Sequence, residues 1–570
     1  MKSGQERGIG GRVKSLFPIL TWLPRYNWKD IRFDLIAGIA VAGLIIPESM
    51  GIAGVAGVEP QHGLYAILIA LFLYAIFGSG HRSMVSTPSA LALLTATAIA
   101  ALALTQYEDV LAAVITITLL TGMILLVMGV LRLGLLANFI SYPVMKGFLF
   151  GLALTIIIGQ VPKLLGVEKG DGNFFEQLWH IMGELGQISL VTLGLSIVAV
   201  IALYVLEERF KKIPAVLVLF VIGLGAAYLL NWESWGVELV GTIPAGLPSF
   251  SVPEMNLELV YLVIPAALGI AFVCFSESVA IGDEVAEKHN EEVDPNQELL
   301  AVAATNIGSS FAQGIGTGVS MSASHVGDDS GSRTQMTLIV AGLVVLATLL
   351  FLTGVFYYLP DFILGVIVVF AVKGAMKVRL MSSYYRIQRI DFYFAMLALF
   401  GVLIFEVLVG LILAIIFALG MLIWKVSNER GSLLGRMPDG RFKDISLHPE
   451  AREVEGVRIF RLNTGLFYAH APVVKARLLS IIREEPRPKL LIVDMEVHTR
   501  MLDISSGRAL EKVVREGRER GVTVVFAGVH TLPLRDMEKQ GLVELIGRDS
   551  IKDTIEEALL DGEHPSDPGP

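Results

Sequence analysis

The sequence predicts a polytopic α-helical membrane protein that is followed by a small cytosolic α/β domain. Of its 570 residues, 54% are hydrophobic and only 17% are charged, which is too apolar for a soluble globule with a polar surface. Apolar stretches of about 20 residues, long enough to span a bilayer, recur from Ile36 to Trp424. Beyond Trp424 the chain becomes charged and alternates in polarity, as soluble strands and helices do.

The composition argues against several classes of function. The net charge is −9 and the sequence has no dense field of Lys and Arg, whereas phosphate neutralisation supplies most of the affinity of nucleic-acid-binding proteins. A single cysteine, Cys274, cannot form an intrachain disulfide or a cysteine-based metal site. The sequence has no recognisable catalytic triad, zinc constellation or redox pair. We therefore expect neither an enzyme nor a cofactor or metal, and no nucleic acid as a partner.

The Lys and Arg residues divide the loops between two sides of the membrane. The N-terminal segment, the loop after the sixth span and the region of the twelfth span are basic, whereas "TQYED" and "NWESWGVELVGTIPAGLPSFSVPEMNLE" contain no Lys or Arg. The N-terminus and the α/β domain should therefore both be cytoplasmic, which requires an even number of crossings, and fourteen segments fit. We expect a multi-pass protein of the plasma (inner) membrane, in contact with lipid.

These patterns predict the order of domains along the chain. The expected parts are a cytoplasmic segment 1–32, a membrane domain 33–425, a linker 426–444, an α/β domain 445–561 and a disordered tail 562–570. Within the α/β domain, apolar periodicity predicts strand 457–463, helix 473–484, strand 490–495, helix 505–520 and strand 522–527, followed by short helices.

Two of the predicted membrane segments are broken helices. One, "SMVSTPSALALLTATAIAALAL", begins with small polar residues and Pro88, and the other, "GIGTGVSMSASHVGDDSGSRTQ", is Gly-rich and too short for an ordinary span. Interrupted segments at matching places in two halves indicate a transporter site, because the start of a half-helix offers free amides and a positive dipole end to an anion. They are the third and tenth segments, which predicts two halves of seven.

The first and eighth segments form a second matching pair, and they carry Glu48 and Glu277. Glu277 lies two-thirds of the way along the otherwise apolar stretch "LVYLVIPAALGIAFVCFSESVAIG". A carboxylate at bilayer depth costs roughly 2.5–3.5 kcal/mol and usually faces a bundle interior or a water-filled cavity. The pattern therefore indicates a functional carboxylate, although a neutral carboxyl bonded within the helix bundle is the alternative for both residues.

Several motifs carry a family resemblance that covers nearly the whole chain. They are "FDLIAGIAVAGLIIPESMG", "HGLYAILIALFLYAIFGSGHRSMVSTPSA", "FSESVAIG", "DPNQELLAVAATNIGSSFAQG", and "GTGVSMSASH" followed by "GSRTQ". In these the sequence resembles the sulfate permease family of anion transporters, with its solute carrier 26 relatives, joined to a STAS domain. The resemblance implies an inverted seven-plus-seven repeat with core and gate domains, an anion site between the half-helices, elevator-like alternating access and a homodimer.

The sequence departs from the family pattern at three places. Glu48 stands where the family usually has glutamine, and Ala323 stands where many members place a cation that helps to hold the anion. Glu277 keeps an acidic residue where a bacterial bicarbonate member has the aspartate of its sodium site, but Ile281 replaces the hydroxyl one turn further on. The missing hydroxyl weakens the case for sodium, and two carboxylates without a nearby cation favour protonation. We therefore expect proton coupling through Glu277.

The candidate anion site consists of backbone amides and hydroxyl groups at the starts of the two half-helices, together with Glu48. The alternative is that these hydroxyls only satisfy carbonyl groups within packed helices. The expected residues are Glu48, Ser86, Thr87, Ser89, Ala90, Val319, Ser320, Met321 and Ser322.

In the STAS domain, "MLDISSGRAL" sets Ser505 and Ser506 at the turn that opens a helix. Related anti-sigma antagonists carry a phosphorylated hydroxyl there, so the two serines are candidate regulatory residues. The simpler alternative, which we favour, is that Ser505 caps the helix.

The residues leave three functions open. The first is a secondary active transporter of sulfate, bicarbonate or a dicarboxylate, driven by proton symport. The second is a sodium-coupled bicarbonate transporter. The third is an anion channel, or a sensor that signals through the STAS domain. A channel would need no coupling carboxylate within the membrane, so Glu277 favours a transporter.

Overall fold

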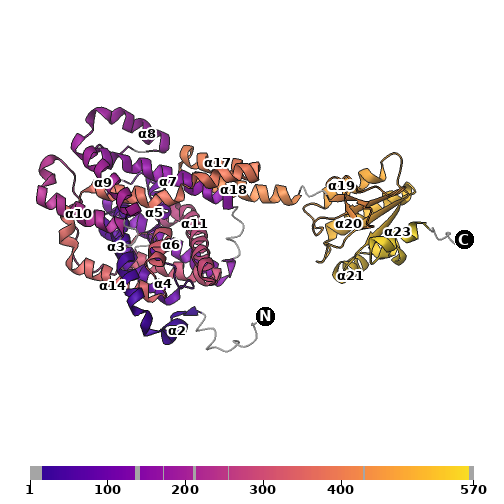
Figure 1. Ribbon diagram of the computed structural model, residues 1–570, viewed down its shortest axis with the longest axis horizontal. Helices are drawn as coiled ribbons and strands as arrows, with labels where there is room; N and C mark the ends of the chain where they lie inside the picture. The colour runs from indigo at the N-terminus through magenta and orange to yellow at the C-terminus, as the bar shows by residue number, and fades with distance from the viewer. Residues whose placement is uncertain are drawn as a thin grey trace. The chain divides into compact units, whose positions relative to one another are not determined.

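The computed structural model describes residues 16–104, 106–134, 142–170, 172–209, 214–253, 256–427 and 431–563. The chain forms two compact units, Met1–Ala418 and Leu419–Pro570, and each has hydrophobic clusters of its own. Figure 1 shows that the first unit is built from helices and that the second contains a sheet covered by helices.

The helices of the first unit follow one another closely along the chain. Their bounds are α2 Ile19–Trp22, α3 Ile31–Val55, α4 Pro60–Phe77, α5 Ser89–Ala100, α6 Tyr107–Val130, α7 Tyr142–Leu165, α8 Phe174–Gly183, α9 Leu190–Arg209, α10 Ala215–Leu230, α11 Leu257–His289, α12 Pro295–Phe311, α13 Met321–Asp329, α14 Met336–Phe351, α15 Asp361–Val372, α16 Val378–Ile387, α17 Arg389–Ile404 and α18 Glu406–Ser427, the last of which crosses the boundary between the units.

The apolar helices have the lengths expected of membrane segments. Within the described residues, α3 (with the turn before it), α4, α6, α7, α9 and α11 are each long and apolar enough to span a bilayer. The helices α5, α10, α14 and α15 are apolar but shorter. Large apolar side chains such as Val198 and Ile222 are exposed on the surface, as expected where helices face lipid.

Fourteen of the seventeen α-helices described in this unit form two sets of seven, and α2, α8 and α16 lie outside both sets. The first set is α3, α4, α5, α6, α7, α9 and α10, and the second is α11, α12, α13, α14, α15, α17 and α18. The third member of each set is short and follows a two-residue strand, β1 Val85–Ser86 or β2 Gly318–Val319. Each set therefore has a half-helix in third place, which is the arrangement expected of a seven-plus-seven repeat.

The sequence explains both helix breaks. Pro88 favours an extended conformation for Thr87, so a helix cannot continue through this point, and α5 begins at Ser89 with Pro88 as its N-cap. Before α13, three glycines at 314, 316 and 318 make a continuous helix unfavourable. At Gly318 an added Cβ would lie 3.3 Å from Pro88 Cγ, so glycine also permits the close approach of the two strands.

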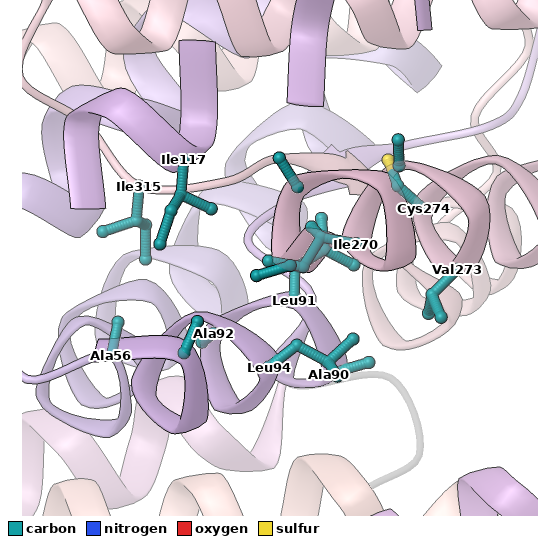
Figure 2. Packing of buried hydrophobic residues seen from close by; sticks show 14 of the residues in the cluster. Ala56, Ala90, Leu91, Ala92, Leu94, Ile117, Ile270, Val273, Cys274 and Ile315 are labelled. Carbon is teal, nitrogen blue, oxygen red and sulfur yellow. The ribbon is translucent and has the colours of Figure 1, made fainter. Parts of the chain in front are cut away.

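The helices pack in two groups. In one group, α6 and α4 pack against α12, and α11 packs against α6 and the half-helix α5. In the other group, α7 packs against α15 and α17. Figure 2 shows Leu91 of α5 beside Ile270 of α11 in a fully buried cluster that also contains Ile117 of α6. The half-helix α5 is therefore packed within the first group.

A buried carboxylate joins the start of α3 to the start of α14. Asp34 is fully buried and accepts hydrogen bonds from the Arg333 and Thr334 amides at 2.9 and 3.1 Å. The hydroxyls of Thr334, Thr337 and Tyr26 donate to the same carboxylate at 2.8, 3.0 and 3.1 Å. This network explains physically why "FDLIAG" and "GSRTQ" occur together in one sequence.

The second unit is a six-stranded sheet in the order β4-β3-β5-β6-β7-β8. The strands β5 to β8 are parallel, whereas β3 pairs antiparallel with both β4 and β5. The bounds are β3 Ser432–Arg436, β4 Phe442–Asp444, β5 Val457–Arg461, α19 Ala471–Ile482, β6 Leu490–Asp494, α20 Ile504–Glu519, β7 Thr523–Ala527, α21 Thr531–Lys539, α22 Leu542–Ile546, β8 Ile551–Lys552 and α23 Ile555–Glu563.

Successive side chains along each strand point to opposite faces of this sheet, and helices cover both faces. Leu491 and Val493 of β6 belong to the cluster with α19 and α20, whereas Leu490 and Ile492 belong to the cluster with α23. The predicted strands and helices of this domain are found within a few residues of their expected bounds.

The structure differs from the sequence expectation in the segment 426–444. This segment, expected to be a linker, contains β3 and β4, which form a hairpin around "MPDG" and belong to the sheet. The strands have only five and three residues, so the sequence shows no periodic pattern that would predict them. At the chain ends, α23 continues to Glu563, whereas residues 1–15 and 564–570 lie outside the described residues.

Candidate functional site

The starts of the two half-helices are held together by the pairing of β1 with β2. Val85 is opposite Val319 and Ser86 is opposite Gly318 in this antiparallel pair. The connection continues beyond the strands, because the Ser320 amide donates to the Met84 carbonyl at 2.9 Å. The Met84 amide in turn donates to the hydroxyl of Ser324 on α13 at 2.9 Å. Backbone and side-chain bonds thus join α5 and α13 at their N-terminal ends.

The first turns of the two half-helices differ in how they are capped. The N-cap of α5 is Pro88, which has no side-chain hydrogen bond to offer, so the amides of Ser89 and Ala90 are left for another acceptor. The N-cap of α13 is Ser320, whose hydroxyl accepts a hydrogen bond from the Ala323 amide. An anion would therefore find its most available backbone donors at α5, where the helix dipole also favours negative charge.

A cavity of about 1030 Å³ lies at these helix starts. On one side it is lined by α3, α5, α11 and α13, and on the other by α7, α10 and α15 with the residues that follow it. Seven of the residues expected from the sequence line it, namely Glu48, Ser89, Ala90, Glu277, Ser320, Met321 and Ser322. The structure therefore brings together residues of the first, third, eighth and tenth segments.

Three other expected residues do not line the cavity and make internal contacts instead. The Thr87 hydroxyl donates to the Ser49 hydroxyl at 3.1 Å, and the Ser86 hydroxyl lies 3.5 Å from the same atom. The Val319 amide donates to the hydroxyl of Ser278 at 3.2 Å. These contacts fix the strand pair against α3 and α11, so Ser86, Thr87 and Val319 position the half-helices.

Glu48 is bound directly to the second half-helix. The hydroxyl of Ser322 is 3.0 and 3.3 Å from its two carboxylate oxygens, and only 4% of the residue is exposed. Glu48 thereby links α3 to the first turn of α13 at the wall of the cavity. The sequence placed it near the anion site, and the structure adds the partner that orients it.

Glu277 is half-buried on α11 and faces the same cavity. Its Oε2 atom is buried and has no hydrogen-bond partner among the described residues. Lys146 of α7, a cation, lines the same cavity. The expectation that no cation lies near the two carboxylates is therefore corrected.

Sequence reasoning missed Lys146 and Asn306. Lys146 is the only charged residue in "VMKGFLFGLALTIIIG", and ionisable residues within apolar segments are commonly functional, so the signal was present. Asn306 donates to the Thr317 carbonyl and accepts from the Thr317 amide, at 2.8 and 3.0 Å. It holds the extended chain before β2, and nothing in the sequence marks an amide on α12 as its partner.

Several other charged residues also line the cavity. Lys373 is bound to Glu207 at 2.8 Å, Lys377 is exposed, and His325 lies 3.7 Å from Glu284. Lys373 and Lys377 follow the end of α15, and Asp329 is the last residue of α13. Among the described residues, no group of three His, Cys, Asp or Glu side chains could hold a metal ion.

In the second unit, the two candidate serines lie in different environments. Ser505 is exposed, whereas Ser506 is fully buried. Asp503 is the N-cap of α20 and accepts from the amide and hydroxyl of Ser506 at 2.9 and 3.1 Å. The expectation that Ser505 caps this helix is therefore wrong, because the carboxylate of Asp503 occupies that position.

A buried histidine lies in the same unit. The Nδ1 atom of His498 accepts a hydrogen bond from the Leu466 amide at 2.9 Å, so this ring is neutral with its proton on Nε2. Burial lowers the pKa of His498 from its usual value of 6.5.

Comparison with known proteins identifies the family. The model of the sulfate permease family matches residues 31–398, which is more than half of the chain. The chain belongs to the sulfate permease family. The STAS domain model matches residues 448–558. This membership assigns the protein to a family of anion transporters rather than to the enzymes.

Similar curated proteins extend over almost the whole sequence. Sulfate transporter 1.3 of Arabidopsis thaliana is 30% identical, over 96% of this chain and 87% of its own length. High affinity sulfate transporter 2 of Stylosanthes hamata is 28% identical, over 98% and 88%. A probable sulfate transporter of Mycobacterium tuberculosis is 29% identical, over 95% and 99%.

Solved structures confirm the fold class. The murine Solute Carrier 26 family member A9 anion transporter, in its inward-facing state, matches with a TM-score of 0.88 at 22% identity, covering 99% of this chain and 96% of that one. The transmembrane domain of the cyanobacterial bicarbonate transporter BicA matches with a TM-score of 0.60 at 19% identity, covering 69% and 98%. The sulfate permease fold with its C-terminal STAS domain is thus present.

Proposed function

We propose that this protein is a secondary active transporter that moves a small anion into the cell together with a proton. The observation that carries the proposal is the cavity itself, in which Glu277 and the uncapped start of α5 face the same space. Glu277 has a buried carboxylate oxygen without a hydrogen-bond partner among the described residues, as expected of a group that must gain and lose a proton.

The proposed substrate is sulfate, bicarbonate or a dicarboxylate such as succinate. The backbone amides at Ser89 and Ala90 suit oxyanions of several shapes, whereas the Ser322 hydroxyl already donates to Glu48. Sulfate is the first candidate because the similar curated proteins from plants and Mycobacterium are named as sulfate transporters.

Proton coupling supplies the energy that the anion requires. Moving one negative charge inward against a negative interior costs about 2.3 kcal/mol per 100 mV, and about twice that for a divalent anion. Each proton that travels with the anion cancels one charge and adds the energy of the pH gradient. A neutral Glu277 also avoids like-charge repulsion of the anion, so protonation and anion binding favour each other.

The proposed movement is an elevator-like alternation between inward and outward access. The β1–β2 pair and the Glu48–Ser322 contact make α3, α5 and α13 one body, which can carry the site intact past the group of α7, α15 and α17. The protein would act as a homodimer in the plasma membrane, with both termini in the cytoplasm.

The test is uptake into proteoliposomes, with sulfate, bicarbonate and succinate supplied separately. Inward pH and sodium gradients are imposed one at a time. The proposal requires accumulation that follows the pH gradient and is independent of sodium. Uptake that requires sodium and ignores pH would support the sodium-coupled alternative, and a protein that only equilibrates anions would be a channel.

The role of Glu277 is tested in the same assay. Glu277→Gln mimics the protonated form, so the variant should fold and bind anion but lose pH-driven accumulation. Glu287→Gln is the matched control, because Glu287 lies on the same helix, is exposed and does not line the cavity. If Glu277→Gln retained the pH-driven uptake of the parent, Glu277 would not be the coupling group.

A further inference from the structure

Lys146 is a cation in the cavity that has no partner of opposite charge in contact with it. It lies one turn inside α7, is half-buried, and lines the same cavity as Glu277 and the start of α5. Its ammonium group is 5.1 Å from the centroid of the Tyr142 ring, and it makes no hydrogen bond or ion pair with the described residues. A half-buried ammonium group without a counter-ion is costly unless a ligand or a mobile partner neutralises it.

The other cations of the cavity are less suited to hold a ligand there. Lys373 is already bound to Glu207 at 2.8 Å and is exposed, and Lys377 is exposed as well. Position 323 on the second half-helix is an alanine. Three lysines line the cavity among the described residues, and of these Lys146 is half-buried and has no carboxylate in contact with it.

Lys146 and Glu277 lie on the two different helix groups that enclose the cavity. Lys146 belongs to α7, which packs with α15 and α17, whereas Glu277 belongs to α11, which packs with α5 and α6. Lys146 and Glu277 therefore line the same cavity from different helices. An anion that entered this cavity would therefore meet the ammonium group of Lys146 and the carboxyl group of Glu277 together.

We propose that Lys146 binds the transported anion in this cavity, and that the anion and Glu277 compete for it. When the cavity is empty, Lys146 stabilises the ionised carboxylate of Glu277. When the anion is bound, Lys146 is neutralised, and Glu277 faces a negative charge without a counter-ion, so it takes up a proton. The inference rests on the proposed proton-coupled transport and identifies the group that connects anion binding to protonation.

The other ionisable groups around the cavity do not supply this link. The remaining acids are Glu48, which is bound to Ser322, Glu207, which is bound to Lys373, and Asp329 at the end of α13. His325 on α13 lies 3.7 Å from Glu284. In the alternative to our proposal, Lys146 would only anchor the cytoplasmic end of α7 against Tyr142, without contact with the anion.

The test compares three variants of Lys146 with the parent. Lys146→Met and Lys146→Gln remove the charge, and Lys146→Arg keeps it. Loss of the ammonium group as a charged hydrogen-bond donor weakens anion binding. The half-saturating concentration of the transported anion should therefore rise about ten- to a hundredfold. Lys146→Arg should stay within a few-fold of the parent. Arg379→Met is the matched control, because Arg379 is an exposed cation at the cytoplasmic side that does not line the cavity.

If the anion and Glu277 compete for Lys146, removing the Glu277 charge should strengthen anion binding to the purified protein, whereas removing the Lys146 charge should weaken it. Glu277→Gln removes the competitor, so it should bind sulfate, bicarbonate or succinate more tightly than the parent at high pH, measured by calorimetry or by anion-dependent thermal stabilisation. In the double variant Lys146→Gln and Glu277→Gln this gain should disappear. A gain of equal size with and without Lys146 would mean that the two residues do not compete.

The results separate this inference from the proposed function. Unchanged anion affinity in both neutral variants, or equal loss in Lys146→Arg and Lys146→Met, would overturn the role of the Lys146 charge even if the parent were driven by pH. Conversely, if the parent ignored the pH gradient while Lys146→Met and Lys146→Gln still weakened anion binding, the anion contact would stand and proton coupling would fail.

Discussion

The replacement of Asp34 by asparagine tests whether one buried carboxylate holds α3 to α14. Asp34 accepts hydrogen bonds from two amides and three hydroxyls, contributed by Tyr26, Arg333, Thr334 and Thr337. Hydrogen bonds to a charged group contribute about 1.5–3 kcal/mol, and those to a neutral group about 0.5–1.5 kcal/mol. Asp34→Asn keeps the shape of the side chain but removes its charge and replaces one acceptor oxygen with an NH2 donor. The free energy of unfolding should therefore fall by about 2–4 kcal/mol.

This loss converts into a measurable shift of the melting temperature. Unfolding entropies of about 2.1 cal/mol/K per residue give about 0.9 kcal/mol/K for a unit the size of Met1–Ala418. Asp34→Asn should therefore melt about 2–5 °C below the parent, as measured by intrinsic fluorescence of the purified protein in detergent.

The neighbouring pair of Asp30 with Arg333 provides the control. Its atoms are 2.5 Å apart, but 46% of the Arg333 side chain is exposed, and an exposed ion pair contributes at most about 1 kcal/mol. Asp30→Asn should lower the melting temperature by only about 1 °C. Equal shifts for Asp30→Asn and Asp34→Asn would refute the reasoning, because burial and the number of donors would then not decide the effect.

Three further predictions concern the termini and the STAS domain. Single cysteines introduced as Lys14→Cys and Glu563→Cys should not react with a membrane-impermeant reagent in intact cells, and labelling of either would refute the cytoplasmic location. Ser506→Asp should destabilise the STAS domain because the side chain is fully buried, whereas Ser505→Asp should be tolerated, as measured by limited proteolysis of the full chain. Burial lowers the pKa of His498, so the unfolded domain binds a proton more readily; stability should be constant above pH 6.5 and fall below it. Proteolysis at about pH 5.5 should therefore be faster than at neutral pH, and His498→Gln should remove most of that difference.

The sequence was sufficient for the parts of the fold that depend on local patterns. Pro88 and the glycines before Met321 predict the two breaks, because they act on the backbone of their own segment. Short runs rich in apolar and β-branched residues predict β5, β6 and β7 for the same reason. The short strands β3 and β4 were missed because runs of five and three residues are too short for a periodic pattern, and their order depends on pairing with β5.

The candidate site was predictable in outline, and its details depend on packing. The starts of both half-helices and Glu277 could be located from matching positions in the two halves. The Val319 amide donates to the Ser278 hydroxyl, so it is not available to an anion. This contact depends on how α11 packs against β2, which the sequence does not show. The proximity of Lys146 to Glu277 could not be inferred either, because 130 positions separate them in the sequence and only the tertiary fold brings α7 opposite α11.

The ladder between β1 and β2 constrains how the two halves of the chain can diverge. It is two residue pairs long, and Gly318 already lies so close to Pro88 that an added methyl group would be in tight contact. A larger residue in one strand would displace the start of the half-helix that follows the other. Positions 85 and 86 should therefore co-vary with 319 and 318 among relatives, and insertions should be excluded from both strands even where the flanking loops vary in length.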